Sequence, residues 1–102
     1  FEVAAEMRGE HLGAVLCLCT VGELLCSGSA DKTIRVWKRD RRGFSHSVVA
    51  VLQGHEGPVK CIAASADVAS GFLIYSGSID QSIKVWWVSG HQTLPLTPPD
   101  WI

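Results

Sequence analysis

Histidine, serine and aspartate occur together twice in this chain, and each set is followed by a tryptophan. The two sets are His11, Ser29 and Asp31 before Trp37, and His55, Ser78 and Asp80 before Trp86. A nucleophile, its general base and an orienting acid could be built from these three residue types. Three features argue against a hydrolase: the set occurs twice, each serine is accompanied by a tryptophan, and neither serine lies in a Gly-x-Ser-x-Gly elbow. We therefore expect both sets to be structural.

The positions of these side chains belong to an internal repeat. His11 and Cys17 lie 44 positions before His55 and Cys61, whereas the segment SGSADKTIRVW lies 49 positions before SGSIDQSIKVW. The second unit therefore has five additional residues, in a loop ahead of its SGS segment. Self-similarity at this period indicates a repeat architecture, in which roughly three or more units are needed for a stable stack. We expect the two units to belong to a larger assembly.

Composition and hydrophobic pattern indicate an all-β chain of short strands. Of the 102 residues, 47% are hydrophobic, and no window shows the helical period. Runs such as AVLCLC and TIRVW are apolar on both faces, which suits interior strands of covered sheets. Strands are expected at residues 2–7, 14–19, 23–27, 33–38, 47–52, 59–64, 72–76 and 82–88. No segment approaches the ~18 consecutive apolar residues of a membrane span, and no signal-peptide pattern is present.

The charge and the cysteines argue against several further classes of protein. A formal net charge of −1 does not suit a general binder of nucleic acids or membrane surfaces. The four cysteines could form disulfides or a metal site, but Cys17 and Cys19 point the same way along a strand. They are accompanied by neither a Cys-x-x-Cys pair nor a suitably spaced histidine. We expect small buried core residues in a reducing compartment, with no metal and no cofactor.

The repeated segments resemble a known family. GHEGPVKCIAAS followed by YSGSIDQSIKVW, with the weaker copy GEHLGAVLCLC followed by CSGSADKTIRVW, is similar to the WD-repeat, whose units form the four-stranded blades of a β-propeller. The resemblance implies two blades of a larger ring, the last blade lacking its outer strand. It divides the chain into residues 1–8, the outer strand of a preceding blade, 9–53 and 54–89, the two WD repeats, and 90–102, a proline-rich tail. KRDRRG, VAVLQGH and YSGSIDQSIKVWWVS further resemble the last two repeats of a plant subfamily related to Jingubang and to the repeat domain of myosin heavy chain kinase.

The resemblance also assigns roles to the two repeated sets of side chains. In the family these residue types form a buried hydrogen-bonded tetrad, and no residue is assigned a catalytic role. The tetrad maps onto His11, Ser29, Asp31 and Trp37, and onto His55, Ser78, Asp80 and Trp86. The chain departs from the family pattern at Glu10, which replaces a glycine, and at Lys38 and Trp87, which replace the aspartate that names the repeat. The Trp-Asp-x-Arg box by which many ubiquitin-ligase receptors dock their adaptor is therefore missing.

The expected function is surface binding. WD-repeat propellers often bind partners at the narrow top face, and the matching positions are Ala14, Leu16, Ala30, Pro58, Lys60 and Ile79. Five of the six are apolar, which suits a protein or peptide partner rather than a phosphate or methyl-lysine, although small residues could instead pack under loops. The resemblance implies a non-enzymatic protein-interaction scaffold or adaptor of the cytoplasm or nucleus, without a small-molecule, nucleic-acid or membrane partner. The alternative is a targeting or substrate-recognition module of a kinase or ubiquitin ligase whose catalytic part lies outside this chain.

Two segments lie outside this scheme. Lys38, Arg39, Arg41 and Arg42 form a basic run that we interpret as a solvated loop, with a nuclear-targeting signal or an acidic-partner patch as the alternatives. Residues 90–102, GHQTLPLTPPDWI, carry three of the four prolines and are expected to be an extended tail. Docking of this tail as a polyproline segment is the alternative.

Overall fold

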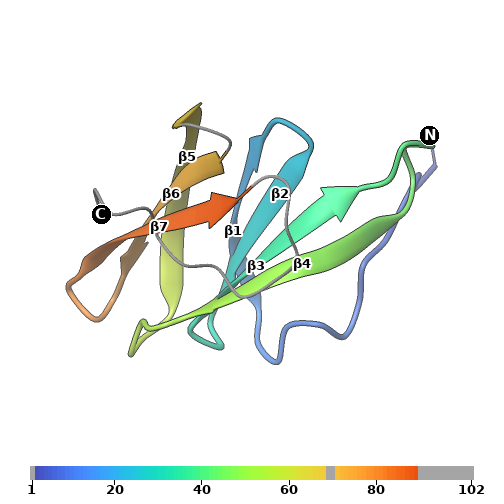
Figure 1. Cartoon of the computed structure of the whole chain (residues 1–102). Coiled ribbons are helices and arrows are strands. Elements are labelled where there is room, and N and C mark those ends of the chain that lie inside the picture. The colour runs from blue at the N-terminus through green and yellow to red at the C-terminus, as the bar shows by residue number, and fades with distance from the viewer. Residues whose placement is uncertain (1, 69–70, 90–102) are drawn as a thin grey trace.

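The computed structural model describes residues 2–68 and 71–89 of the chain. Over these residues the chain forms seven strands and no helix (Figure 1). The strands are β1 (Val15–Val21), β2 (Leu24–Ser29), β3 (Thr33–Arg39), β4 (His46–Gln53), β5 (Val59–Val68), β6 (Gly71–Ser78) and β7 (Ile83–Ser89). The all-β prediction is confirmed. Within these described residues there is no helix long and apolar enough to cross a membrane.

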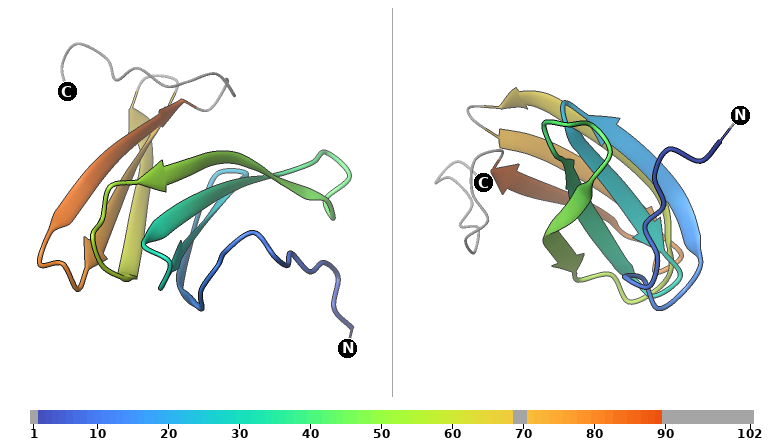
Figure 2. Two further views of the ribbon diagram at one scale, coloured as in Figure 1. Left: turned by 90° about the horizontal axis from the view of Figure 1, so that it is seen from below. Right: turned by 90° about the vertical axis from the view of Figure 1, so that its right-hand side faces the viewer.

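The strands form two antiparallel sheets and follow one another in chain order within each. The first sheet has the order β1-β2-β3-β4, and the second, among the described residues, has the order β5-β6-β7. Antiparallel neighbours joined by short turns are what closely spaced strands with turn residues between them produce. Figures 1 and 2 show the two sheets lying side by side. They correspond to the two predicted blades, of four and three strands.

The hydrophobic core lies between the two sheets. Cys26, Ile34 and Val36 from the first sheet and Val59 and Ile74 from the second are all 0% exposed. Alternate residues of a strand point to opposite faces, so each sheet contributes one face to this core. Partly buried side chains surround it, among them Cys17, Cys19, Val21, Leu52, Ile62, Phe72 and Trp86. Since each fully buried aliphatic side chain contributes about 1.5–3 kcal/mol, the contact between the sheets is the main source of stability.

Gly28 allows the two sheets to approach closely at the centre of this core. A β carbon at this position would lie 2.6 Å from Cys17 Sγ, 2.7 Å from Val59 Cγ1 and 3.1 Å from Ile62 Cδ1. The Cys17 thiol also donates to the backbone carbonyl of Val59, at 3.6 Å. Any side chain at position 28 would therefore push β5 away from β2.

Two expectations from the sequence are wrong. Residues 2–14 contain no strand, so the strand expected at 2–7 is not formed, whereas the assignment of residues 1–8 to a preceding blade stays a prediction. A strand needs a neighbour for its backbone hydrogen bonds, and none of the described strands pairs with this segment. Cys61 is exposed instead of buried because it lies on the face of the second sheet that points away from the core, whereas Cys26 is buried as expected. All four cysteines lie within the described residues and are free thiols.

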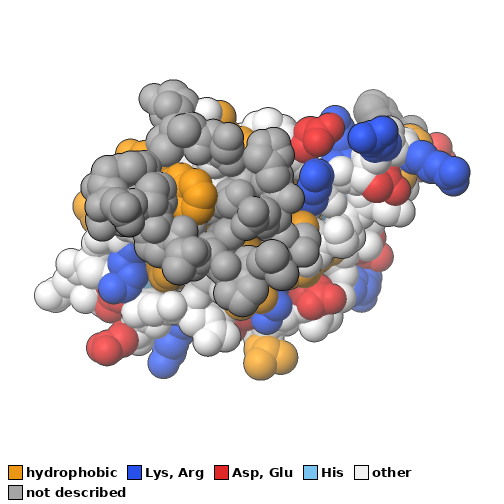
Figure 3. Space-filling model, in the orientation of Figure 1, with side chains coloured by type: hydrophobic (Ala, Val, Ile, Leu, Met, Phe, Trp, Pro, Cys, Tyr) orange, Lys and Arg blue, Asp and Glu red, His pale blue; other side chains and the backbone are white. Residues whose placement is uncertain are grey.

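The basic run lies at the far end of the β3–β4 hairpin. Lys38 and Arg39 end β3 and so do not lie in the expected loop, whereas Arg41 and Arg42 lie in the turn before β4; all four are exposed, as expected. Figure 3 shows Lys and Arg side chains gathered at this end of the molecule. The proline-rich tail, residues 90–102, lies outside the described residues.

Candidate functional site

A chain of hydrogen bonds joins three segments of the first repeat. The indole N–H of Trp37, on β3, donates to Ser27 Oγ, on β2, at 2.9 Å. Ser27 Oγ lies 2.7 Å from His11 Nε2, and His11 Nδ1 lies 3.0 Å from Asp31 Oδ2. An ionised carboxylate can only accept, so Nδ1 carries a proton, and the Ser27 hydroxyl is then free to donate to Nε2. This series of hydrogen bonds therefore fastens the segment ahead of β1 to the middle of the sheet.

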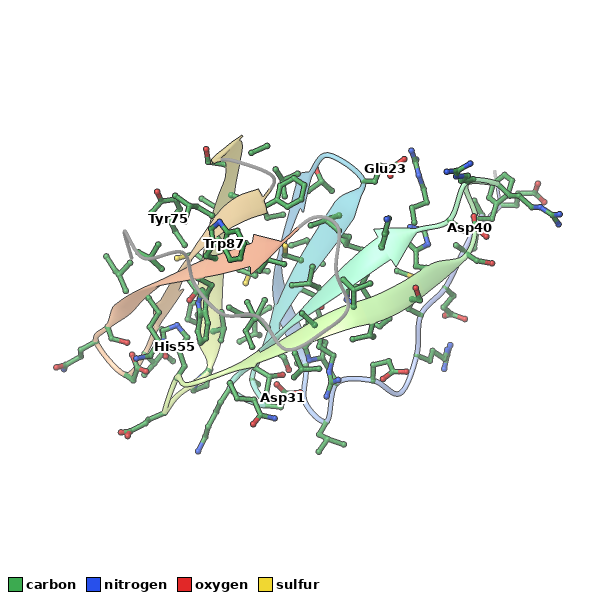
Figure 4. The ribbon with its side chains drawn as sticks, in the orientation of Figure 1. Glu23, Asp31, Asp40, His55, Tyr75 and Trp87 are labelled. Carbon is green, nitrogen blue, oxygen red and sulfur yellow. The ribbon has the colours of Figure 1, made fainter. Side chains whose placement is uncertain are left out.

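The second repeat reproduces this arrangement closely. Trp86 Nε1 donates to Ser76 Oγ at 2.8 Å, Ser76 Oγ lies 2.7 Å from His55 Nε2, and His55 Nδ1 lies 2.9 Å from Asp80 Oδ2. The His55 ring also meets the Trp86 ring edge to face, with 6.2 Å between centroids. In Figure 4 the labelled Asp31 and His55 lie at the same edge of the two sheets. The two repeats thus contain matching polar networks.

The serines of the two networks are not Ser29 and Ser78, which the family resemblance assigned. Ser29 and Ser78 do not bond to a tryptophan; each instead accepts from the backbone N–H of an aspartate, Asp31 or Asp80, at 3.0 Å. The reason is the register of the β2–β3 pair. Trp37 lies directly opposite Leu25, so Ser27, two residues further along β2, is its diagonal neighbour. Ser29 lies two residues further along the strand, about 7 Å away. Ser27 and Ser76 are therefore the residues that the sequence reasoning missed, and hairpin register was the signal that could have found them.

Asp31 and Asp80 each connect a turn to the loop that carries the histidine. Asp31 Oδ1 accepts from the backbone N–H of Thr33 at 2.9 Å and from its hydroxyl at 2.5 Å, while Oδ2 accepts from the Leu12 N–H at 2.9 Å. In the second repeat, Asp80 makes the corresponding bonds with the backbone and hydroxyl of Ser82 and with the Glu56 N–H. Each aspartate thus caps its turn, and Thr33 and Ser82 join the networks.

These bonds hold both carboxylates in the ionised form. Partial burial raises the pKa of Asp31, but hydrogen bonds from Thr33, Leu12 and His11 outweigh it and hold the pKa well below the usual range. The Ser82 hydroxyl is the main cause of the equally lowered pKa of Asp80, opposed by desolvation and assisted by Glu56 and His55. An aspartate with this pKa is a hydrogen-bond acceptor at every physiological pH.

The geometry does not suit nucleophilic catalysis by the serines. Ser27 and Ser76 are 4% and 1% exposed, so neither hydroxyl can meet a substrate without the sheet opening. Each hydroxyl also accepts from a tryptophan, which would compete with attack on an electrophile. Among the described residues, no group of three or more His, Cys, Asp or Glu side chains could hold a metal ion. The networks are built to position strands.

The six predicted top-face residues lie where the strands begin or end, and together they form one edge of the two sheets. Ala14 and Pro58 directly precede β1 and β5, Ala30 and Ile79 directly follow β2 and β6, and Leu16 and Lys60 are the second residues of β1 and β5. Backbone bonds join them in pairs, from Ala30 N–H to the Ala14 carbonyl at 2.9 Å and from Ile79 N–H to the Pro58 carbonyl at 3.3 Å. Leu16 and Ile79 are 38% and 63% exposed. This edge is the lower one in Figure 1.

Two sheets of this topology, each fastened by the same His-Ser-Trp network, define a pair of propeller blades, and the comparison with family models agrees. The model described as WD domain, G-beta repeat (WD40) matches residues 5–38 and 46–86. The chain belongs to the WD40 repeat family.

Relatives of several kinds share these repeats. The chain is 33% identical to the probable cytosolic iron-sulfur protein assembly protein 1 of Kluyveromyces lactis, over 62% of this chain and 20% of that protein. It is 37% identical to the protein transport protein sec13 of Emericella nidulans, over 78% of this chain and 25% of that protein. A third relative is zinc finger CCCH domain-containing protein 62 of Arabidopsis thaliana, which is 32% identical over 74% of this chain and 17% of that protein. The chain thus spans a quarter or less of the length of these relatives.

Solved structures support the fold. The computationally designed protein Ika4 superposes with a TM-score of 0.65 at 24% identity, over 90% of this chain and 51% of that chain. The designed protein Ika8 gives a TM-score of 0.63 at 25% identity, over 87% and 25% of the two chains. These likenesses concern the arrangement of the strands alone.

Proposed function

We propose that this chain is a non-enzymatic scaffold that binds other proteins or peptides at the edge formed by its six top-face residues. The observation that carries the proposal is the contrast at this edge between fixed and free groups. The His, Ser and Asp side chains beside it are engaged in the two networks, whereas Leu16 and Ile79 are exposed apolar side chains. Exposed apolar groups on a rigid support favour a protein partner because their burial needs little reordering.

The subfamily, the alternative role and the cellular location of the chain are narrower proposals. Membership of the plant subfamily related to Jingubang stays a prediction that rests on the quoted sequence segments. A targeting role in a kinase or ubiquitin-ligase complex is the alternative, and Lys38 and Trp87 at the positions of the family's aspartate do not favour docking to a ligase adaptor. Placement in the cytoplasm or nucleus is supported by the four free thiols, which suit a reducing compartment.

The experiment compares two double variants that are matched in exposure. Leu16→Glu with Ile79→Glu alters the proposed edge, while Val51→Glu with Phe44→Glu alters apolar side chains of 38% and 65% exposure on β4 and its hairpin. Each protein is immobilised, and the proteins it captures from a cell extract are quantified against the wild type. We expect the control to keep the wild-type set and the edge variant to lose it. Equal capture by the two variants would show that partners bind elsewhere.

A further inference from the structure

The turn between β3 and β4 presents a serine hydroxyl that the fold does not use. Ser45 is exposed and lies directly ahead of β4. Its backbone carbonyl accepts from the Asp40 N–H at 2.8 Å and closes the turn, whereas none of the described residues bonds to its hydroxyl. Figures 1 and 2 show the β3–β4 hairpin extending past the β1–β2 turn. The Ser45 hydroxyl is therefore open to another protein.

Ser45 differs in this respect from the other serine and threonine residues that the structure describes. Each of those is buried, is bonded within a network or its turn, or belongs to a strand: Thr20, Ser27, Ser29, Thr33, Ser47, Ser65, Ser76, Ser78, Ser82 and Ser89. An enzyme that modifies a hydroxyl must hold the residue and its neighbours in its own cleft. A strand residue has to leave its sheet for this, so Ser45 is the described hydroxyl that is reached at the least cost.

The turn itself opens at low cost. Besides the bond that closes it, the Gly43 N–H donates to the Asp40 carbonyl at 3.1 Å and to the Asp40 carboxylate at 2.8 Å, and the His46 ring lies 3.3 Å from the Phe44 carbonyl. Phe44 is 65% exposed, so little apolar packing is lost when the turn extends. Segments held by a few exposed hydrogen bonds open most readily. The turn can therefore enter a cleft while the core stays intact.

The basic run stands ahead of this serine, and Arg42, its last member, precedes Ser45 by three positions. All four of its side chains are exposed, and none forms an ion pair with another described residue. Residues 38–47 contain four cations and one carboxylate, a formal charge of +3 in a chain of net −1. The hydroxyl is thus preceded by concentrated positive charge.

We propose that Ser45 is a phosphorylation site for a protein kinase that recognises arginine ahead of the acceptor residue. Kinases select substrates by the charges that flank the acceptor, so this kinase has carboxylates in its substrate groove, which pair with Arg42 and its neighbours. Ser45 is followed by a histidine, and no Asp or Glu occurs before Glu56. A kinase that requires a proline or an acidic residue after the acceptor therefore does not fit this segment.

The reaction transfers one phosphoryl group from ATP. Ser45 Oγ attacks the γ-phosphorus and forms the new bond, while the bond from that phosphorus to the oxygen that bridges the β- and γ-phosphates breaks and ADP leaves. The hydroxyl proton passes to the catalytic aspartate of the kinase. The chain is the substrate of this step, which agrees with its proposed non-enzymatic role.

The basic run also offers contacts to the phosphate once it is attached. A phosphoserine carries a charge of about −1.5 to −2 and three strong acceptor oxygens. Guanidinium groups bind phosphate oxygens in pairs, and those of the basic run have no ion-pair partner among the described residues before modification. Phosphorylation therefore lowers the formal charge of residues 38–47 from +3 to about +1 and ties the turn to the end of β3.

The modified turn lies at the opposite end of the first sheet from the proposed binding edge. Strand β3 begins two residues after Asp31, beside that edge, and ends at Arg39, next to the turn. The phosphate therefore changes a second surface of the scaffold and leaves the six top-face residues as they are.

The first test locates the phosphate. The 102-residue chain is incubated with ATP, Mg²⁺ and calmodulin-dependent protein kinase II, which takes an arginine three positions ahead of the acceptor, and in parallel with casein kinase 2, which reads acidic residues. Mass spectrometry identifies the modified residues. We expect the first kinase, and not the second, to phosphorylate Ser45. Ser45→Ala should lose this phosphate, and Ser47→Ala, which removes a hydroxyl within β4, should keep it.

Arg42→Gln tests whether arginine guides the kinase. We expect kcat/KM for phosphorylation of Ser45 to fall about tenfold or more. Arg8→Gln, at an arginine ahead of β1 whose side chain is 81% exposed, is the control and should keep the wild-type value. Circular dichroism checks that both variants fold like the wild type. An unmodified Ser45, or a kcat/KM that Arg42→Gln leaves unchanged, would overturn the proposal.

A second measurement tests the contact between the phosphate and the basic run. The midpoint of urea unfolding is compared for the phosphorylated and the unmodified chain in low salt and in about 1 M salt, where exposed charges are screened. We expect phosphorylation to raise the midpoint in low salt only. A midpoint that is unchanged or lower in low salt, or a gain that persists in high salt, would show that the phosphate does not bind the basic run.

Discussion

Trp37 donates its indole N–H to Ser27 Oγ across the β2–β3 pair at 2.9 Å, and Ser27 is in turn 2.7 Å from a ring nitrogen of His11. Trp37 is 6% exposed, so its N–H depends on this one hydroxyl for its hydrogen bond. The relationship explains why a polar residue occurs in the apolar run of β2. It also fixes the edge of the sheet at which the proposed binding residues lie.

Replacing Ser27 by alanine should cost substantial stability. The change leaves the Trp37 N–H and His11 Nε2 without their partner in a buried position, which we expect to lower the free energy of unfolding by about 2 kcal/mol. The measurement is urea unfolding followed by tryptophan fluorescence, with wild type and variant at the same protein concentration.

Ser29→Ala is the matched control for this prediction. Ser29 is also buried, but it accepts only from the Asp31 N–H in a partly exposed turn, where water can take its place. We expect a loss of about 1 kcal/mol or less. A larger loss for Ser29→Ala than for Ser27→Ala would contradict the network observed in the structure.

The pattern of hydrophobic and turn residues predicts some features of the structure and not others. The seven observed strands lie within a few residues of the predicted ones because alternation and turn residues are local signals. Ser27 and Ser29 lie on the same face of β2, so alternation could not choose between them, and only the pairing of Trp37 with Leu25 does. The burial of individual side chains was harder to predict than the strands. Cys26 and Tyr75 occupy the same position of the repeat, and their exposure depends on whether another sheet covers them, which the strand's own sequence does not state.

The two aspartates should make the fold sensitive to acid. Hydrogen bonds hold the pKa of Asp31 and Asp80 below the usual aspartate value of about 3.9. A carboxyl with a lowered folded pKa stabilises the fold at pH values above its unfolded pKa, and this contribution is lost as the pH falls through the folded pKa. The contribution of the two aspartates should therefore be constant near neutrality and fall below about pH 4. Asp31→Asn should reduce both the stability at pH 7 and the steepness of this fall.

The measurement is the free energy of unfolding in urea at intervals of pH, for the wild type and for Asp31→Asn. Glu23→Gln, which alters an exposed carboxylate at the opposite edge of the first sheet, is the control and should retain the wild-type slope. If Asp31→Asn left the slope unchanged while lowering stability, the carboxylate would matter for its shape and not for its charge.

Lys32 should be a site at which glycine stabilises the protein. Its φ of 76° lies in the left-handed region, and Gln81 has a φ of 73° at the same place in the second repeat. This conformation costs a residue with a β carbon about 1–2 kcal/mol, which exceeds the entropy cost of glycine of about 0.5–1 kcal/mol. Lys32→Gly should raise the free energy of unfolding by about 0.5–1 kcal/mol. Lys60→Gly, within β5, should lower it by a similar amount, and a loss for both would refute the argument from φ.

The same small change at Gly28 and at Gly77 should differ in its cost to stability. The β carbon of Gly28→Ala meets Cys17 and Val59 inside the core, so we expect a loss of about 1–3 kcal/mol in the free energy of unfolding. At Gly77 the β carbon meets only the exposed Cys61 among the described residues, and this side chain can shift, so Gly77→Ala should lose less stability than Gly28→Ala. Urea unfolding of the two variants measures the difference, and an equal or larger loss for Gly77→Ala would show that the close approach of the two sheets at Gly28 does not set the cost.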